Sequence, residues 1–219
     1  MRNKVLVTYA TCTGSTVGVA EAIGKSLSAG GEHVDVLPMR DVQDLSPYQA
    51  VVAGSAIQNK QWLPEAMQFI RVHQTELNQK PFAAFLVWMT LAMRNGEKYR
   101  PFVAEFLAPV RTLVKPVSEG LFAGALDVRK VPSASERFKF RLSVLFGVWK
   151  EGDHRDWNAI QAWAESLRPR LIGYAWRKEN CDDTFVLFLV LFGRHSVEYG
   201  PGAPGEFRRN PPPSHDRQV

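Results

Sequence analysis

The chain has 219 residues, of which 45% are hydrophobic and 22% charged, a composition typical of one soluble globular domain with or without a tail. Its two cysteines, Cys12 and Cys181, are far apart and have no histidine at metal-ligand spacing, which argues against a disulfide framework and against a bound metal. The formal net charge of +5 at pH 7 favours an anionic partner such as a membrane surface or an acidic ligand, and we expect no nucleic-acid partner.

The apolar segments of the sequence argue against export and against membrane insertion. The run Val5–Val7 follows the first residues directly, without the longer apolar region and the cleavage site of a signal peptide. The longest apolar run, Phe185–Phe192, is far shorter than the roughly 20 residues needed to span a bilayer. We therefore expect a cytoplasmic protein.

Short apolar runs alternate along the chain with segments of helical period. In chain order, we expect a strand over Lys4–Tyr9, a helix over Val17–Leu27, strands over His33–Pro38 and Gln49–Gly54, a helix over Leu63–Leu77, a strand over Phe82–Trp88, a helix over Tyr99–Val114, a strand over Leu121–Leu126 and a helix over Trp157–Leu171. Five strands that alternate with helices imply an α/β fold, in which a parallel sheet is covered by helices on both faces.

Two regions interrupt this alternation. Residues 127–155 form an insertion before the last helix, and residues 173–219 form a C-terminal tail that we expect to be partly disordered because of its glycine and proline content. Within the tail, the apolar run Thr184–Phe192 has no assigned partner. We assign residues 1–172 to one domain.

A loop rich in hydroxyl groups lies between the first strand and the first helix. Its residues are Thr11, Cys12, Thr13, Gly14, Ser15 and Thr16. Such a loop directs backbone N–H groups and hydroxyls at one point, on the positive end of the helix dipole, and can hold a phosphate there. Gly14 allows the backbone to turn tightly around the anion.

The loop lacks the features of other phosphate sites. No lysine follows Gly14, which argues against the loop of nucleotide hydrolases, and a G-x-G-x-x-G pattern for a dinucleotide is also missing. A monophosphate carried by a larger cofactor suits the loop better. The alternative is that Thr13 or Ser15 only caps the helix.

The T-x-T-G-x-T pattern in this position resembles the phosphate motif of flavodoxins, and the resemblance covers about residues 3–172. It continues through Val51–Ile57, Gly124–Leu126 and Gly152–Trp157. The last two segments are similar to the branch that contains menaquinone-dependent protoporphyrinogen dehydrogenase. Members of that branch carry a similar G-A-L strand, a basic and aromatic insertion, and a D-W pair before the final helix.

The resemblance implies a flavodoxin-like five-stranded parallel sheet of order 2-1-3-4-5, with flavin mononucleotide (FMN) at the carboxyl ends of the strands. It implies that Thr11–Thr16 hold the phosphate. One wall of the ring site would be Ser55, Ala56, Ile57, Gln58 and Asn59 with Trp62, and the other Thr90, Leu91, Ala92 and Met93. Trp62 either stacks on the flavin ring or anchors the helix that begins at Leu63.

The insertion carries most of the basic excess. Over residues 129–150, the cations Arg129, Lys130, Arg137, Lys139, Arg141 and Lys150 stand against the single acid Glu136. A helix from Ser135 would place on one face Phe138, Leu142, Leu145, Phe146 and Trp149. This pattern is typical of a helix in an anionic membrane interface, on the inner face of the membrane. Alternatively, the apolar stripe packs on the domain, or residues 138–142 form a strand.

The resemblance implies an FMN-dependent oxidoreductase, similar to protoporphyrinogen dehydrogenase, that passes electrons from an organic donor through FMN to a quinone or another redox partner. The chain contains no credible Ser/His/Asp set, so the flavin is expected to supply the chemistry and no catalytic residue is assigned. The first alternative is a flavodoxin-type electron carrier without a substrate of its own, which the basic charge disfavours because such carriers are usually acidic. A flavin-free interaction domain is the second alternative.

Overall fold

The computed structural model describes residues 4–93, 95–130, 134–146 and 150–171. The tail over residues 173–219, including the apolar run Thr184–Phe192, lies outside the described residues, as does Trp149. Among the described residues, no helix is both long enough and apolar enough to cross a membrane.

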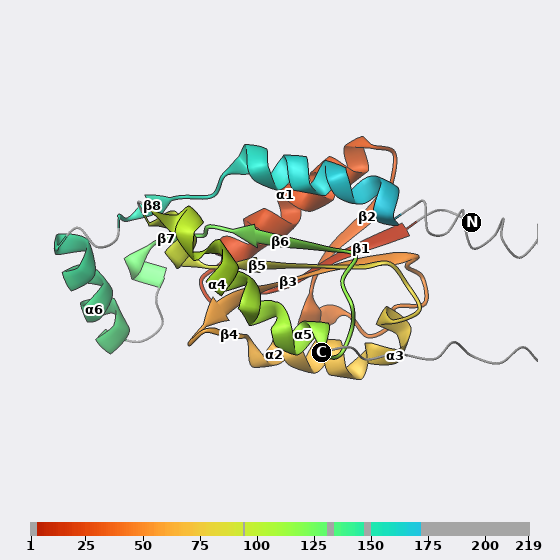
Figure 1. Ribbon diagram of the computed structural model, residues 1–219, viewed down its shortest axis with the longest axis horizontal. Helices are drawn as coiled ribbons and strands as arrows, with labels where there is room; N and C mark the ends of the chain where they lie inside the picture. Colours follow the sequence, from red (N-terminus) through yellow and green to blue (C-terminus); the bar gives the residue numbers. More distant parts are fainter. Residues whose placement is uncertain (1–3, 94, 131–133, 147–149, 172–219) are drawn as a thin grey trace, which may run out of the picture. The chain divides into compact units, whose positions relative to one another are not determined.

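A central parallel sheet forms the middle layer of the domain (Figure 1). Its strands are β1 (Lys4–Ala10), β2 (His33–Pro38), β3 (Ala50–Gln58), β5 (Phe82–Val87) and β6 (Ser118–Phe122). They lie in the order β2-β1-β3-β5-β6, and the two residues of β4 (Gln61–Trp62) pair antiparallel with the end of β3. The order confirms the doubly wound flavodoxin-like sheet expected from the sequence.

Helices cover both faces of the sheet (Figure 1). The first face is covered by α1 (Ser15–Ala29) and by a helix over residues 157–171, which we call the last helix. The second face is covered by α2 (Pro64–Val72), α3 (Gln74–Leu77), α4 (Arg100–Ala104) and α5 (Ala108–Arg111). Because side chains alternate along a strand, Val5 and Val7 of β1 join the first core and Leu6 joins the second.

The short 3₁₀ segments lie at the ends of these elements: Met39–Asp41, Met89–Ala92, Gly96–Tyr99, Glu105–Leu107 and Val128–Lys130. They divide the helix that the sequence predicted over Tyr99–Val114 into α4 and α5. Pro109 lacks the N–H of an interior helix position, so it stands in the first turn of the new helix.

The predicted strand over Leu121–Leu126 is two separate elements. β6 ends at Phe122, and Ala125–Leu126 form β7, which pairs antiparallel with β8 (Gly152–Asp153) in a small second sheet. The chain leaves the main sheet at this point because β8, at the far end of the insertion, supplies the partner for β7. The sequence pattern shows two apolar runs, but it does not show that the second run pairs with β8 instead of with the main sheet.

Between β7 and β8, the insertion forms the helix α6 (Ala134–Leu145). A helix beginning near Ser135 was expected, and the structure excludes the strand alternative over residues 138–142. The apolar stripe does not pack on the domain: Phe138, Leu142, Leu145 and Phe146 are exposed by 65%, 41%, 79% and 74%.

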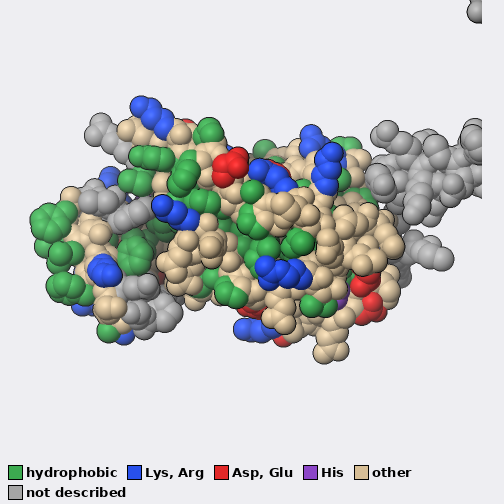
Figure 2. Space-filling view, turned by 60° about the horizontal axis from the view of Figure 1, so that its bottom comes forward, with side chains coloured by type: hydrophobic (Ala, Val, Ile, Leu, Met, Phe, Trp, Pro, Cys, Tyr) green, Lys and Arg blue, Asp and Glu red, His purple; other side chains and the backbone are tan. Residues whose placement is uncertain are grey.

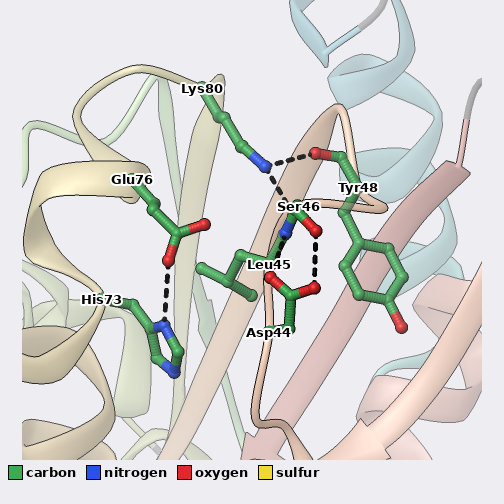
Figure 3. Close-up of polar contacts among 7 residues, drawn as sticks. All are labelled: Asp44, Leu45, Ser46, Tyr48, His73, Glu76 and Lys80. Carbon is green, nitrogen blue, oxygen red and sulfur yellow. Dashed lines mark hydrogen bonds and ion pairs between the residues drawn. The ribbon is translucent and has the colours of Figure 1, made fainter.

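The amino ends of the central strands are closed by polar contacts (Figure 3). The ammonium group of Lys80, just before β5, donates to the carbonyl oxygens of Leu45 and Tyr48 in the segment before β3. Asp44 accepts hydrogen bonds from the backbone N–H and the hydroxyl of Ser46 at 2.8 and 2.5 Å. These contacts tie two loops together at the amino ends of the strands. The carboxyl ends lie on the opposite side of the sheet.

Candidate functional site

A large cavity lies at the carboxyl ends of the central strands. Its volume is about 920 Å³, and its walls come from the segments that follow β1, β3, β5 and β6. A smaller cavity of about 80 Å³ lies beside it, lined by Thr13, Gly14, Ser15, Ala125, Asp127 and Arg155. Carboxyl ends of parallel strands are where doubly wound proteins bind ligands.

The loop before α1 has the geometry of an anion site. Gly14 adopts a left-handed backbone (φ 90°), and its N–H donates to the Thr11 hydroxyl at 3.0 Å. Among the described residues, no side chain caps the N-terminus of α1. Neither Thr13 nor Ser15 therefore acts as the helix cap that was the alternative interpretation, and the first N–H groups of the helix are available to a ligand.

A buried hydroxyl lies in the first turn of α1. Thr16 is fully buried, and within the described part of the chain its Oγ1 has no hydrogen-bond partner. An unsatisfied buried hydroxyl is costly, and this one lies in the helix turn whose N–H groups would hold a phosphate. The residues present therefore suit a phosphate group.

Arg155 reaches the same helix end from the far end of the sequence. Its Nη1 donates to the carbonyl oxygen of Ser15 at 3.3 Å, while Nε and Nη2 bind the two carboxylate oxygens of Asp153 at 2.8 and 2.7 Å. The hydrogen bonds from Arg155 hold the pKa of the Asp153 carboxyl below its usual value. Asp156 caps the last helix by accepting the N–H of Ala159 at 2.9 Å.

The segment at the end of β3 forms one wall of the large cavity. Of the residues expected at this wall, Ala56, Ile57, Gln58 and Asn59 line the cavity. Asn59 has a positive φ of 51°, which lets the chain reverse into β4. The thiol of Cys12 lies 3.6 Å from the side-chain oxygen of Gln58, so the loops after β1 and β3 meet at the cavity.

Two predicted residues of this wall face the core instead. The Ser55 hydroxyl accepts the N–H of Leu63 at 3.1 Å and donates to the carbonyl oxygen of Ala56, so it ties β3 to the start of α2. Trp62 is only 4% exposed, belongs to the hydrophobic core on this face of the sheet and does not line the cavity.

The opposite wall follows β5. Of the residues expected at this wall, Thr90 lines the cavity, whereas Leu91, Ala92 and Met93 do not. Leu91 packs against the core, because the 3₁₀ turn over Met89–Ala92 rotates successive side chains away from one another. The aromatic residue at this wall is Trp88, which is packed edge-on against Phe106 with ring centroids 4.9 Å apart.

The third wall comes from β7 and the insertion. It was not predicted, and it consists of Gly124, Ala125, Leu126, Asp127 and, from α6, Lys139, Phe140 and Ser143. The G-A-L segment had been noted in the sequence, and its position at the end of a predicted strand was the available signal for a role in the site. The contribution of α6 and of Arg155 depends on tertiary packing and has no local pattern.

Of the residues predicted for the cofactor, those that line one of the two cavities are Cys12, Thr13, Gly14, Ser15, Ala56, Ile57, Gln58, Asn59 and Thr90. The others line neither cavity: Thr11, Thr16, Ser55, Trp62, Leu91, Ala92 and Met93. The structure thus brings three sequence-distant loops to one place.

Comparison with solved structures finds flavodoxins and flavodiiron proteins. A flavodoxin from the domain Archaea aligns with a TM-score of 0.42 at 23% identity, covering 66% of this chain and 98% of that one. The flavodiiron protein of Giardia intestinalis aligns with a TM-score of 0.46 at 18% identity, covering 80% of this chain and 37% of that one.

Among curated proteins, the chain is similar to the protoporphyrinogen IX dehydrogenase [quinone] of Escherichia coli K12. The two are 25% identical over 175 residues, which cover 75% of this chain and 94% of the relative. The family model of the flavodoxin domain matches residues 6–147 of this chain. Because this match spans more than half of the chain, the protein belongs to the flavodoxin domain family, and FMN is its cofactor.

Proposed function

We propose that the protein is an FMN-dependent oxidoreductase that takes electrons from an organic donor of the protoporphyrinogen type and delivers them to a quinone. Each pair of electrons that leaves the donor with its protons reduces one quinone to a quinol. The similarity to a quinone-dependent protoporphyrinogen IX dehydrogenase supports this proposal. FMN, when bound, supplies the ability to accept and release these electrons.

The observation that carries the proposal is the third wall of the cavity. At about 920 Å³, the cavity is at the upper end of the roughly 300–1,000 Å³ range of small-molecule sites, which favours room for a second flat molecule beside the flavin. Lys139, Phe140 and Ser143 of α6 face this space. A carrier that only exchanges electrons at an exposed flavin edge has no need of such a wall.

We assign the following roles to the residues of the site. The loop Thr11–Thr16 holds the phosphate, the segment Ala56–Asn59 flanks one side of the flavin ring, and Thr90 with Trp88 flanks the other. Phe140 excludes water from the donor side. Lys139 offers a cation to the carboxylates of an acidic donor, as Lys side chains do at anion sites.

Turnover of protoporphyrinogen with a soluble menaquinone analogue tests the enzyme proposal. We expect a rate well above that of free FMN at the same concentration, and a raised KM for the donor in Lys139→Ala. Arg141→Ala is the matched control, because Arg141 belongs to the same helix but does not line the cavity. A wild-type rate equal to that of free FMN would leave the electron carrier as the better description.

We also propose that α6 binds the anionic inner face of the membrane. Phe138, Leu142 and Leu145 are exposed on one face of α6, and the residues directed at the cavity include the more polar Lys139 and Ser143. A surface helix in water directs its apolar stripe at the core, whereas α6 directs only Phe140 among its apolar residues at the cavity and leaves most of its other apolar side chains exposed. Figure 2 shows hydrophobic side chains gathered with basic ones at the end of the molecule that carries α6.

Vesicle binding tests the membrane proposal. The protein should sediment with vesicles rich in phosphatidylglycerol at low salt, less at high salt, and weakly with phosphatidylcholine alone. Leu145→Glu should abolish sedimentation. Val72→Glu is the matched control, since Val72 is 69% exposed on α2, away from the insertion. Equal loss in both variants, or no binding at low salt, would exclude α6 as the membrane contact.

A further inference from the structure

We infer that Arg155 is a specificity residue that holds a fixed cation beside the phosphate of FMN and makes the site prefer FMN to the same flavin without its phosphate. This inference rests on the proposed position of the phosphate at the loop before α1. It adds to that loop a charged group from a distant part of the chain.

The guanidinium of Arg155 is held on three sides. Asp153 binds it through two hydrogen bonds of 2.8 and 2.7 Å, and the ring of Trp157 stacks on it with the centroid 4.3 Å from Cζ. Gly18 of α1 makes the approach possible, because a Cβ there would lie 2.4 Å from Nη1. A side chain fixed in advance loses little freedom when a ligand binds, so more of the interaction contributes to affinity.

The position of Nη1 directs the cation at the start of α1. Nη1 lies 3.3 Å from the carbonyl oxygen of Ser15, and Arg155 lines the small cavity together with Thr13 and Gly14. The hydrogen bonds found among the described residues occupy Nε and one N–H on each terminal nitrogen. One N–H on each terminal nitrogen therefore remains to bind a phosphate oxygen.

The charges around Arg155 are of both signs. The side chain of Arg155 is only 17% exposed, so water screens it weakly. Two acids lie near it: Asp153 is its partner, and Asp127, which also lines the cavity, accepts hydrogen bonds from Arg129. These carboxylates oppose an anionic ligand, so the helix N–H groups and the guanidinium must act together to bind the phosphate.

The experiment compares two ligands and two proteins. Dissociation constants of FMN and riboflavin are measured from quenching of flavin fluorescence, for the wild type and for Arg155→Gln. We expect Arg155→Gln to weaken FMN about 10- to 100-fold, the effect of losing a charge-assisted hydrogen bond, and to change riboflavin by less than about twofold. Arg155→Lys should give an intermediate value, because it keeps the charge but loses the fork that binds Asp153.

Arg168→Gln is the matched control. Arg168 lies on the last helix and donates to the carbonyl oxygen of Gly30 at 2.7 Å, so it makes a similar contact at the opposite end of α1. It should alter thermal stability but not the ratio of the two dissociation constants. Equal weakening of FMN and riboflavin in Arg155→Gln would overturn the inference, and so would unchanged FMN binding. Failure of the wild type to bind FMN would instead overturn the proposed phosphate position itself.

Discussion

The amino ends and the carboxyl ends of the central strands use polar groups in opposite ways, and we call them the amino edge and the carboxyl edge of the sheet. At the amino edge, Lys80 is committed to two backbone carbonyl oxygens and Asp44 to Ser46 (Figure 3). At the carboxyl edge, α1 has no side-chain cap among the described residues, and the buried hydroxyl of Thr16 has no partner there. Lys80 and Asp44 at the amino edge are thus paired within the protein, whereas the hydroxyl of Thr16 at the carboxyl edge is not.

The two arginines that contact α1 show the same contrast. Arg168 closes the C-terminal end of the helix, where the carbonyl of Gly30 accepts its hydrogen bond. Arg155 lies at the N-terminal end, where the helix offers N–H groups and the positive end of its dipole. At this second position the charge of Arg155 is already paired with Asp153, and we propose that the guanidinium also binds the phosphate. The same residue type then has a structural role at one end of α1 and a binding role at the other.

Replacing Lys80 should give the largest loss of stability. Lys80→Met removes a charged donor from the carbonyls of Leu45 and Tyr48, and we expect the free energy of unfolding to fall by about 2–3 kcal/mol. Urea denaturation measures this change. The dissociation constant of FMN should stay within about twofold, and a large loss of FMN affinity would show that the two edges are not independent.

Two glycines with similar backbone strain, one at each edge of the sheet, also test the comparison between the two edges. Gly14 and Gly31 both have left-handed backbones, with φ of 90° and 96°, and a Cβ on either would meet nothing within 4 Å. Substitution of either glycine by alanine should therefore lower the free energy of unfolding by about 1–2 kcal/mol. Only Gly14→Ala should also weaken FMN, by about tenfold, because relief of the strain redirects the N–H groups of the loop. Titration with FMN and thermal denaturation of both variants separate the two effects.

The smallest effect concerns Tyr48 near the amino edge. Burial, together with a 2.7 Å hydrogen bond to Asp35, raises the pKa of Tyr48 to about 12. A pKa raised in the folded state contributes stability that is present below the usual value of 10 and is lost as pH rises through about 12. The free energy of unfolding should therefore fall more steeply between pH 10 and 12 in the wild type than in Tyr48→Phe. Parallel curves would assign the alkaline loss to other groups.

Local patterns in the sequence predicted the layers of the fold and much of the site. Strands such as β1 and β5 are short apolar runs because both faces of a parallel sheet are buried, and this property is visible without any partner. The loop Thr11–Thr16 was also predicted from a local pattern, because a strand, a glycine turn and a helix start lie consecutively in the chain. The helical period of the insertion likewise predicted α6.

Tertiary structure alone decided which groups meet across the site. Arg155 and Ser15 are 140 positions apart in the sequence. Their contact depends on the last helix lying beside α1 and on the absence of a side chain at Gly18, where Arg155 approaches the helix. Trp62 faces the core and Trp88 faces the cavity, although both are aromatic residues at strand ends, because the twist and pairing of each strand set the direction of its last side chain. Secondary structure follows from neighbouring residues, but a binding site follows from the packing of distant ones.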